Sequence, residues 1–346
     1  MRRSDRTARV PACLPGGLAP AGVARAAIAA LVTTAVLAGC AASASNPPSS
    51  HPHADPRRAG WQREGVPGAG LAAVRRGLTG PAAGGPVYYL SLGDSLSRGI
   101  QPTATGQNIP TQRGYADQLA ARLRAAIPRL RLVKLGCSGE TTWTMINGGI
   151  CGYPARSQLA QAVSFLRAHR GRTALITIDI GGNDPNSCVI GARPDTIVGC
   201  LASKVPQLER NLSTILRGLR AAAGRRVLIV GMTYYVPELG LWRSGRTGRQ
   251  IGMLTDAFAA GANRVLVHRY HRYGARVANV FAAFRSTDFG AGGPAGASRS
   301  RRTPPNVTKI CSLTWMCAAP PRGPNEHAND AGYQLIARAF WRAITS

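Results

Sequence analysis

Five short apolar runs recur along the chain from residue 87 onward, and longer amphipathic stretches separate them. Each run is nearly continuous in apolar residues, which is typical of strands that are buried on both faces of a sheet. The five runs are residues 87–92, 131–135, 174–180, 226–232 and 276–281.

Helical periodicity fills the segments between these runs, over about residues 114–126, 157–169, 202–222, 250–273 and 329–344. A strand followed by a helix, repeated along the chain, predicts a parallel sheet that is covered by helices on both faces. The expected fold class is therefore α/β, a flavodoxin-like three-layer α/β/α sandwich with a five-stranded parallel sheet. No internal repeat and no second core is visible, so residues 86–346 are expected to form one domain.

The first 85 residues have a different pattern. Arginines near the N-terminus precede an apolar run over residues 26–38, which is too short to span a bilayer comfortably and ends in "LAGC". This arrangement resembles the signal peptide of bacterial lipoproteins, so residues 1–39 are expected to be removed and Cys40 to be lipidated. An ordinary secretory signal that is cut nearby is the alternative. Residues 40–85 are rich in Pro, Gly, Ala and Ser and predict a flexible tether.

Both signal types place the mature protein outside the cytoplasm, either lipid-anchored at the cell membrane or secreted, where disulfides persist. Of the eight cysteines, Cys13 leaves with the signal peptide and Cys40 carries the lipid, so six remain. Sequence alone does not choose among the possible pairings, and a zinc site competes, although no C-x-x-C spacing supports it. Clustering along the chain favours disulfides between Cys137 and Cys151, Cys188 and Cys200, and Cys311 and Cys317.

The formal net charge of +28 comes from 43 basic and 15 acidic residues. The basic residues are scattered, form no long block and do not alternate with aromatics, so nucleic acid is not the expected partner. The charge favours anionic surfaces such as lipid headgroups or cell-envelope polymers. An arginine-rich composition without a specific anionic partner is the alternative.

Chemistry-bearing residues follow the predicted strands at the ends where ligands bind in open parallel sheets. "GDSLS", with Ser95, follows the first strand, and "GCSGETT", with Gly139, follows the second. "GGNDPN", with Asn183, follows the third strand, and "PNEHAND", with His327, precedes the last helix. We expect these four residues to lie on the same rim of the sheet.

The four motifs, in this order, resemble those of the SGNH hydrolases, also called the GDSL esterases and lipases, over residues 87–345. The resemblance implies that Ser95 is a nucleophile that forms an acyl intermediate and that His327 is its base. It also implies an oxyanion hole formed by the backbone N–H groups of Ser95 and Gly139 and the side-chain amide of Asn183. No metal and no organic cofactor is implied. "GDSLS" differs from the G-x-S-x-G turn of the α/β-hydrolases, which disfavours that related fold.

The sequence departs from this family at the third member of the triad. Most members carry an aspartate three residues before the histidine, and Pro324 occupies that position here. A backbone carbonyl of residues 322–325 could accept the Nδ1 proton of His327 instead, and Glu326 is a weaker candidate because adjacent side chains of an extended segment point apart. Asp94 is expected to accept backbone N–H groups and support the serine turn.

The leading hypothesis is an extracytoplasmic serine ester hydrolase of the carboxylesterase or lipase type, which acts as a monomer on lipid or acetylated-polymer esters. A carbohydrate or peptidoglycan O-acetylesterase on the same fold is one alternative. A non-catalytic surface binding protein on a hydrolase scaffold is another. The glycine-rich loop over residues 285–308 is expected to be either a lid or a disordered insert.

Overall fold

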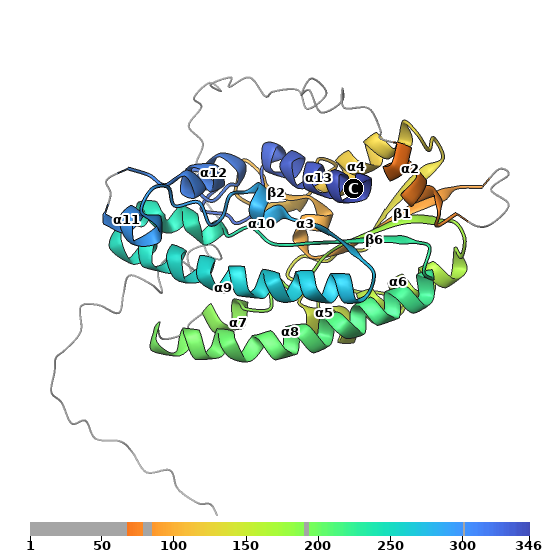
Figure 1. The fold of residues 1–346 in the computed structure, drawn as a ribbon, viewed down its shortest axis with the longest axis horizontal. Coiled ribbons are helices and arrows are strands. Elements are labelled where there is room, and N and C mark those ends of the chain that lie inside the picture. The colour runs from red at the N-terminus through yellow and green to blue at the C-terminus, as the bar shows by residue number, and fades with distance from the viewer. Residues whose placement is uncertain (1–67, 79–84, 190–193, 300–301) are drawn as a thin grey trace, which may run out of the picture. The chain divides into compact units, whose positions relative to one another are not determined.

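Five parallel strands form the centre of the fold (Figure 1). Their order in the sheet is β4-β1-β5-β6-β7, so the first strand along the chain lies between the second and the third. This is the doubly wound, flavodoxin-like order, and it confirms the predicted fold class. The strands are β1 (Val87–Gly93), β4 (Leu130–Lys134), β5 (Thr173–Asp179), β6 (Leu228–Met232) and β7 (Arg276–Ala278).

The computed structural model describes residues 68–78, 85–189, 194–299 and 302–346. All of them belong to one compact unit of the chain, residues 51–346. The predicted signal peptide, the proposed lipidation site Cys40 and most of the predicted tether lie outside the described residues. Among the described helices, none combines the length and the apolar character that a membrane span requires.

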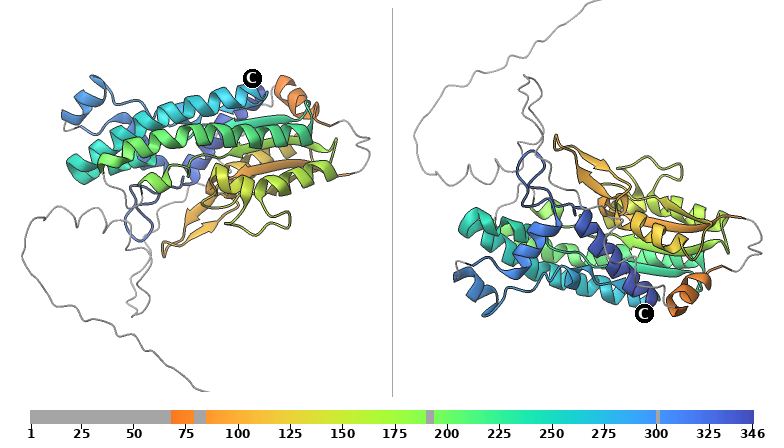
Figure 2. Two further views of the ribbon diagram at one scale, coloured as in Figure 1. Left: turned by 90° about the horizontal axis from the view of Figure 1, so that it is seen from below. Right: turned by 90° about the horizontal axis from the view of Figure 1, so that it is seen from above.

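Helices cover both faces of the sheet, and each face has its own apolar core (Figures 1 and 2). One core is formed with α2 (Gly68–Arg75), α4 (Tyr115–Arg124) and α13 (Asp330–Thr345). The other is formed with α6 (Gln158–Ala168), α8 (Pro194–Ala223) and α9 (Gly245–Arg272). Every residue of the central strand β5 is buried, as expected of a strand that is covered on both faces.

Two predicted boundaries differ from the structure for local reasons. The last strand ends at Ala278 because Asn279 caps α10 (Val280–Ala283), its side chain accepting a hydrogen bond from the Ala282 N–H. Helix α2 lies within the predicted tether, and its Val74 is fully buried against the core next to α13. Residues before position 86 therefore pack with the domain.

The loop over residues 285–308 is not a structureless insert. It contains α11 (Gly293–Arg299) and the start of α12 (Pro305–Leu313). Its anchor is Asn306, which is fully buried and donates through its side chain to the Ser286 carbonyl at 2.8 Å. A lid function for this segment stays a prediction.

Sequence periodicity missed several short elements, because each is shorter than the window that the pattern needs. An antiparallel hairpin pairs β2 with β3 directly after the serine turn. The missed elements are β2 (Ile100–Pro102), β3 (Asn108–Pro110), α3 (Ser95–Arg98), α5 (Thr142–Asn147), α7 (Asn186–Val189) and the 3-10 helix η2 (Pro237–Ser244).

Three disulfides are present, and their pairing confirms the prediction from clustering. Their Cα–Cα distances are 6.1, 5.5 and 5.0 Å in chain order, all within the ordinary range. Each closes a short loop beside one of the strand-end motifs, and together they are consistent with an extracytoplasmic location. The pairs are Cys137–Cys151, Cys188–Cys200 and Cys311–Cys317.

Candidate active site

Ser95 is the first residue of the short helix α3, which starts directly after β1. The turn requires glycine before it, because Gly93 has φ +129° and an added Cβ would lie 2.0 Å from the Asp179 carbonyl oxygen on β5. Asp94 caps the helix, since its Oδ1 accepts from the Leu96 N–H at 2.9 Å. The structure therefore gives Asp94 the supporting place expected from the sequence.

A fully buried carboxylate, Asp179 at the end of β5, holds the serine turn from below. Its Oδ2 accepts from the Ser97 N–H at 3.1 Å and the Asp94 N–H at 3.3 Å, and its Oδ1 accepts from the Tyr115 hydroxyl. Burial, and then the negative charge of Asp94, raise the pKa of Asp179 well above its usual range. Asp179 thus fixes the backbone on both sides of Ser95.

Two consecutive tyrosines connect the serine turn with the histidine segment. The Tyr234 hydroxyl donates to Asp94 Oδ2 at 2.7 Å, and the Tyr235 hydroxyl donates to the backbone carbonyl of Glu326 at 2.8 Å. Because Asp94 precedes Ser95 and Glu326 precedes His327, adjacent residues after β6 contact the neighbours of both predicted catalytic residues.

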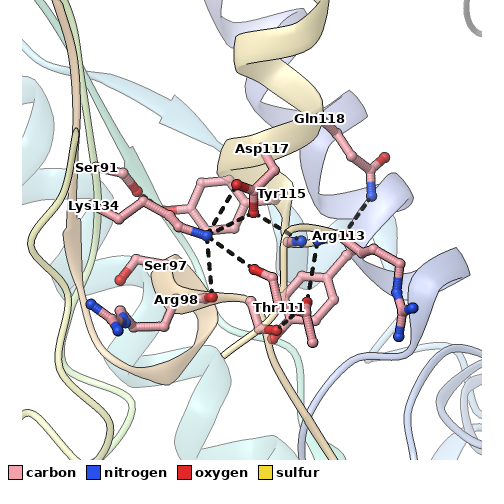
Figure 3. A network of polar contacts seen from close by, with 12 residues as sticks. Ser91, Ser97, Arg98, Thr111, Arg113, Tyr115, Asp117, Gln118 and Lys134 are labelled. Carbon is pink, nitrogen blue, oxygen red and sulfur yellow. Dashed lines mark hydrogen bonds and ion pairs between the residues drawn. The ribbon is translucent and has the colours of Figure 1, made fainter. Parts of the chain in front are cut away.

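The far end of α3 is fixed by a lysine (Figure 3). Lys134, the last residue of β4, donates through Nζ to the carbonyls of Arg98 at 3.4 Å and Thr111 at 3.0 Å. The same ammonium forms a largely buried ion pair with Asp117 of α4 at 2.9 Å. Helix α3 is therefore tied at its start to β5 and at its end to β4 and α4.

The loop after β4 passes close to α3 and then turns outward at Gly139. Gly139 has φ +79°, and an added Cβ would meet no atom within 4 Å, so this position faces open space. No described residue accepts a hydrogen bond from the backbone N–H of Gly139, and the same holds for the N–H of Ser95. Both groups are thus available as donors to a ligand.

Asn183 lies in the loop after β5 and points toward the Gly139 loop. Its Nδ2 donates to the Glu140 carbonyl at 3.0 Å, and its Oδ1 accepts from the Asn186 side chain at 3.1 Å. An amide nitrogen carries two hydrogens, so one remains for a further acceptor. Asp184 joins the same two loops, accepting from the Thr142 N–H at 2.9 Å and from the Thr142 hydroxyl.

Gly139 and Asn183 line one cavity of about 410 Å³. Among the described residues that line it, the only large apolar side chain is Trp143, which is half exposed. Lys204 of α8 also lines the cavity, and its charge is attracted by Asp184. The remaining lining residues are all polar: Thr141, Asn186, Ser187 and Gln207.

His327 lies in the segment before α13, and its side chain is only 6% exposed. Its Nδ1 lies 2.8 Å from the side-chain Oδ1 of Asn325. This contact corrects the expectation of a backbone carbonyl from residues 322–325, and Glu326 Oε1 lies farther away, at 3.9 Å. Pro324, in the place of the family aspartate, follows a cis peptide bond and makes no polar contact with the ring.

Sequence reasoning missed Asn325, and Asp330, the acidic first residue of α13, is not the cap of this helix. The helix is capped instead by Asn329, whose Oδ1 accepts from the Gly332 N–H at 3.0 Å. Asp330 accepts from Gln101 at 2.7 Å and from Arg113 at 2.9 Å, which ties α13 to the region of the β2–β3 hairpin. The spacing Asn-x-His, typical of a side-chain-to-backbone turn, is the signal that could have identified Asn325.

The predicted nucleophile and base make no hydrogen bond to each other in this structure. His327 Nε2 and the Ser95 hydroxyl also have no other hydrogen-bond partner among the described residues. Catalytic hydrogen bonds are often long in unliganded enzymes and tighten when substrate binds. Within the described residues, no group of three or more His, Cys, Asp or Glu side chains could hold a metal ion.

The family model described as GDSL-like lipase/acylhydrolase matches residues 91–335, which is most of the chain and includes all four motifs. The chain belongs to this family. The family and its fold support an ester hydrolase. Among curated proteins, no relative with significant sequence similarity was found.

Similar solved structures include hydrolases of different named activities. A lipase from a goat rumen metagenome is 17% identical, with a TM-score of 0.47, and the match covers 74% of this chain and 97% of that one. A phospholipase A1 from Streptomyces albidoflavus is 18% identical, with a TM-score of 0.46 and coverage of 75% and 99%. An acetylxylan esterase from Geobacillus stearothermophilus is 17% identical, with a TM-score of 0.45 and coverage of 76% and 96%.

Proposed function

We propose that this GDSL-family protein hydrolyses carboxylic esters through an acyl-Ser95 intermediate. The Ser95 Oγ attacks the ester carbonyl carbon, and its proton passes to Nε2 of His327. The bond from the carbonyl carbon to the alcohol oxygen then breaks, and the alcohol leaves with that proton. Water, deprotonated by the same imidazole, attacks the acyl-enzyme, releases the acid and restores the serine.

The observation that carries this proposal is a set of three unused N–H donors at adjacent strand ends. The N–H groups of Ser95 and Gly139 and one hydrogen of Asn183 Nδ2 have no acceptor among the described residues. Fixed donors of this kind stabilise the negative oxygen that develops when serine attacks a carbonyl. Because Asp179 and Asp184 hold the loops that carry them, these donors need little reorganisation during the reaction.

The test is hydrolysis of a short-chain aryl ester by the full chain and its variants. Ser95→Ala is expected to lower kcat by about 10⁴-fold or more, and Asn183→Ala by about 10²- to 10³-fold. Ser203→Ala is the matched control, because this exposed serine of α8 bonds only to the carbonyl of Cys200. Equal rates for wild type and Ser95→Ala would rule the mechanism out.

A fluorophosphonate probe separates this enzyme from a surface binding protein on the same scaffold. The enzyme is expected to form an adduct on Ser95, whereas a binding protein would remain unlabelled when folded. The presence of Ser95, Gly139, Asn183 and His327 together supports the enzyme, because a site that had lost its activity would be expected to lose these residues independently.

The lining of the cavity favours esters with a short acyl group on a polar, hydroxyl-rich alcohol, such as an O-acetylated carbohydrate. Trp143 offers a flat face to a sugar ring, and the polar wall offers hydrogen bonds, while none of the described lining residues has an aliphatic side chain. An acyl chain of a lipid would need an apolar channel instead. A series of esters from acetyl to palmitoyl tests this: the rate is expected to fall with chain length, and a rise toward palmitoyl would indicate a lipase.

We also propose that the mature protein acts outside the cytoplasm, as a monomer held at the membrane by lipidated Cys40. The three disulfides support an oxidising compartment. Mass spectrometry of the membrane fraction is expected to find acylated Cys40 at the N-terminus. An unmodified or absent Cys40 would favour an ordinary secretory signal.

A further inference from the structure

The geometry points to Asn325 as the positioning residue of His327, in the role that an aspartate has in most of the family. This inference rests on the proposed function, because it assigns the group that orients the proposed base. Asn325 is a neutral amide two residues before the histidine, whereas the family aspartate is a carboxylate three residues before it.

Two hydrogen bonds to one oxygen fix the tautomer of the ring. Asn325 Oδ1 lies 3.0 Å from the backbone N–H of His327 and 2.8 Å from Nδ1 of the same residue. A backbone N–H is always a donor, so the atom that faces it must be the amide oxygen and not the amide nitrogen. Because this oxygen can only accept, Nδ1 must carry a hydrogen, and Nε2 is left with its lone pair free. A general base needs this tautomer to take the proton of a serine.

A second asparagine holds Asn325 in this orientation. The Nδ2 of Asn325 donates to Oδ1 of Asn108 on β3 at 2.9 Å. If the Asn325 amide were rotated by 180°, its nitrogen, a donor, would face the backbone N–H of His327, which is also a donor. The β2–β3 hairpin therefore helps to set the orientation of the predicted base.

The other groups near the ring do not compete for Nδ1. Glu326 Oε1 is 3.9 Å from Nδ1, and the Glu326 side chain is 67% exposed. The Glu326 carbonyl already accepts from the hydroxyl of Tyr235, and the His327 carbonyl accepts from the Trp315 N–H at 3.0 Å. Among the described residues, the titratable groups close to this segment are Glu326, Tyr235 and the buried Glu238, which is near enough to interact with Glu326.

An amide in place of a carboxylate changes the pH range over which the His327 ring is unprotonated. Burial lowers the pKa of His327, and the negative charge of Glu326 opposes this effect only in part. The unprotonated ring is therefore populated to lower pH than in a free histidine. A carboxylate at position 325 would favour the charged imidazolium and reverse this shift.

The test combines the tautomer with the pH profile, measured on the full chain. In nitrogen-15 NMR at pH 8, the His327 ring of wild type is expected to carry its proton on Nδ1, and Asn325→Leu is expected to lose this preference. Asn325→Leu should also lower kcat by about 10²-fold or more, with little change in KM. Asn325→Asp keeps the acceptor and should retain most of kcat, while the acid limb of kcat/KM moves upward by about one pH unit.

Glu326→Gln is the matched control, because it removes the carboxylate whose charge acts on the His327 ring and leaves Asn325 in place. It is expected to keep the Nδ1–H tautomer and to change kcat by no more than about twofold. A large loss in this variant, or an unchanged tautomer and pH profile in both Asn325 variants, would overturn the inference. The NMR measurement does not depend on turnover, so an inactive wild type with an Nδ1–H ring would count against the proposed function alone. Should Asn325→Leu fail to fold, Asn325→Asp still decides the outcome through its pH profile.

Discussion

The serine side and the histidine side of the candidate active site are held by different kinds of structure. The serine turn lies on the sheet itself, and the fully buried Asp179 binds the backbone next to Ser95. The histidine segment lies in a loop, where the backbone of residues 325–329 bonds to residues 313–315 and the polar side chain of Asn325 contacts the exposed hairpin. The nucleophile is thus held through a fully buried carboxylate at the end of a central strand, and the base through contacts between loops.

This difference predicts which property a substitution on each side should affect most. Unsatisfied polar groups cost most where water cannot reach them, so damage on the serine side should appear mainly as lost stability. Damage on the histidine side should appear mainly as lost turnover, because the loop can rearrange without unfolding the domain. The unfolding free energy measures the first kind of damage, and kcat measures the second.

The largest effect on stability is expected from Asp179→Ala. This change leaves the Tyr115 hydroxyl and the Ser97 N–H without their acceptor in a fully buried place, which should cost about 3 kcal/mol of unfolding free energy. Urea denaturation measures the loss. Asp330→Ala is the control on the histidine side: its carboxylate is half exposed, and its removal should cost less than about 1 kcal/mol. Similar losses in both variants would contradict the comparison.

Removing the Cys311–Cys317 disulfide should come next. The cysteines are six residues apart, and the chain-entropy relation predicts a loss of about 2 kcal/mol when both are changed to serine. Because this bridge lies where residues 313–315 pair with the histidine segment, kcat should fall as well. Replacing Cys137 and Cys151 in the same way should cost about 3 kcal/mol. If the loss of kcat were simply proportional to the loss of stability in the two double variants, the Cys311–Cys317 disulfide would have no separate effect on His327.

Tyr234 and Tyr235, which follow β6, allow the same atom, a tyrosine hydroxyl oxygen, to be removed on the serine side and on the histidine side. Tyr234→Phe deprives Asp94 of a donor, and should cost about 1.5 kcal/mol, because the acceptor is a buried carboxylate. Tyr235→Phe frees the Glu326 carbonyl, and should cost about 1 kcal/mol or less but lower kcat more. Denaturation and steady-state kinetics on both variants measure whether Tyr234→Phe loses more stability and Tyr235→Phe loses more kcat. A larger kcat loss in Tyr234→Phe would reverse the assignment of the two sides.

The sequence predicts the sheet and the serine side well, because these depend on patterns that are local. Continuous apolar runs identified the strands, and chemistry at their carboxyl ends identified Ser95, Gly139 and Asn183 as candidates. The structure places Gly139 and Asn183 at one cavity, while their catalytic roles stay predictions.

The histidine side was harder to predict because it depends on contacts between distant segments. The partner of His327 is set by the pairing of residues 325–329 with 313–315 and by Asn108, which is more than 200 residues away in sequence. No pattern of neighbouring residues in the sequence predicts these contacts. The role of Asp179 could not be predicted for the same reason, since its place next to the serine turn follows from the pairing of β1 with β5.

The smallest effect should have the opposite sign, and it compares two buried carboxyls. Asp179 has three donors, whereas Oδ1 of Asp256, within α9, is buried and has no hydrogen-bond partner. Burial raises the pKa of Asp256 from 3.8 to about 6. Well below pH 3.8 this carboxyl is neutral in both the folded and the unfolded state. As the pH rises through about 6, the unfolded state is already ionised, and the folded state must bear a buried charge.

Asp256→Asn removes that charge, which the shift of the pKa makes worth roughly 3 kcal/mol at pH 8. The buried asparagine amide also lacks hydrogen-bond partners, so the net gain should be about 1 kcal/mol. The charge-dependent part of the gain should be lost mainly between pH 6 and pH 4, as the folded wild-type carboxyl becomes protonated. Urea denaturation of both proteins at pH 4, 6 and 8 measures the difference. A gain that stayed constant over this range would mean that Asp256 is solvated in the folded state. A variant less stable than wild type at pH 8 would mean that its carboxylate has a favourable partner, as Asp179 does.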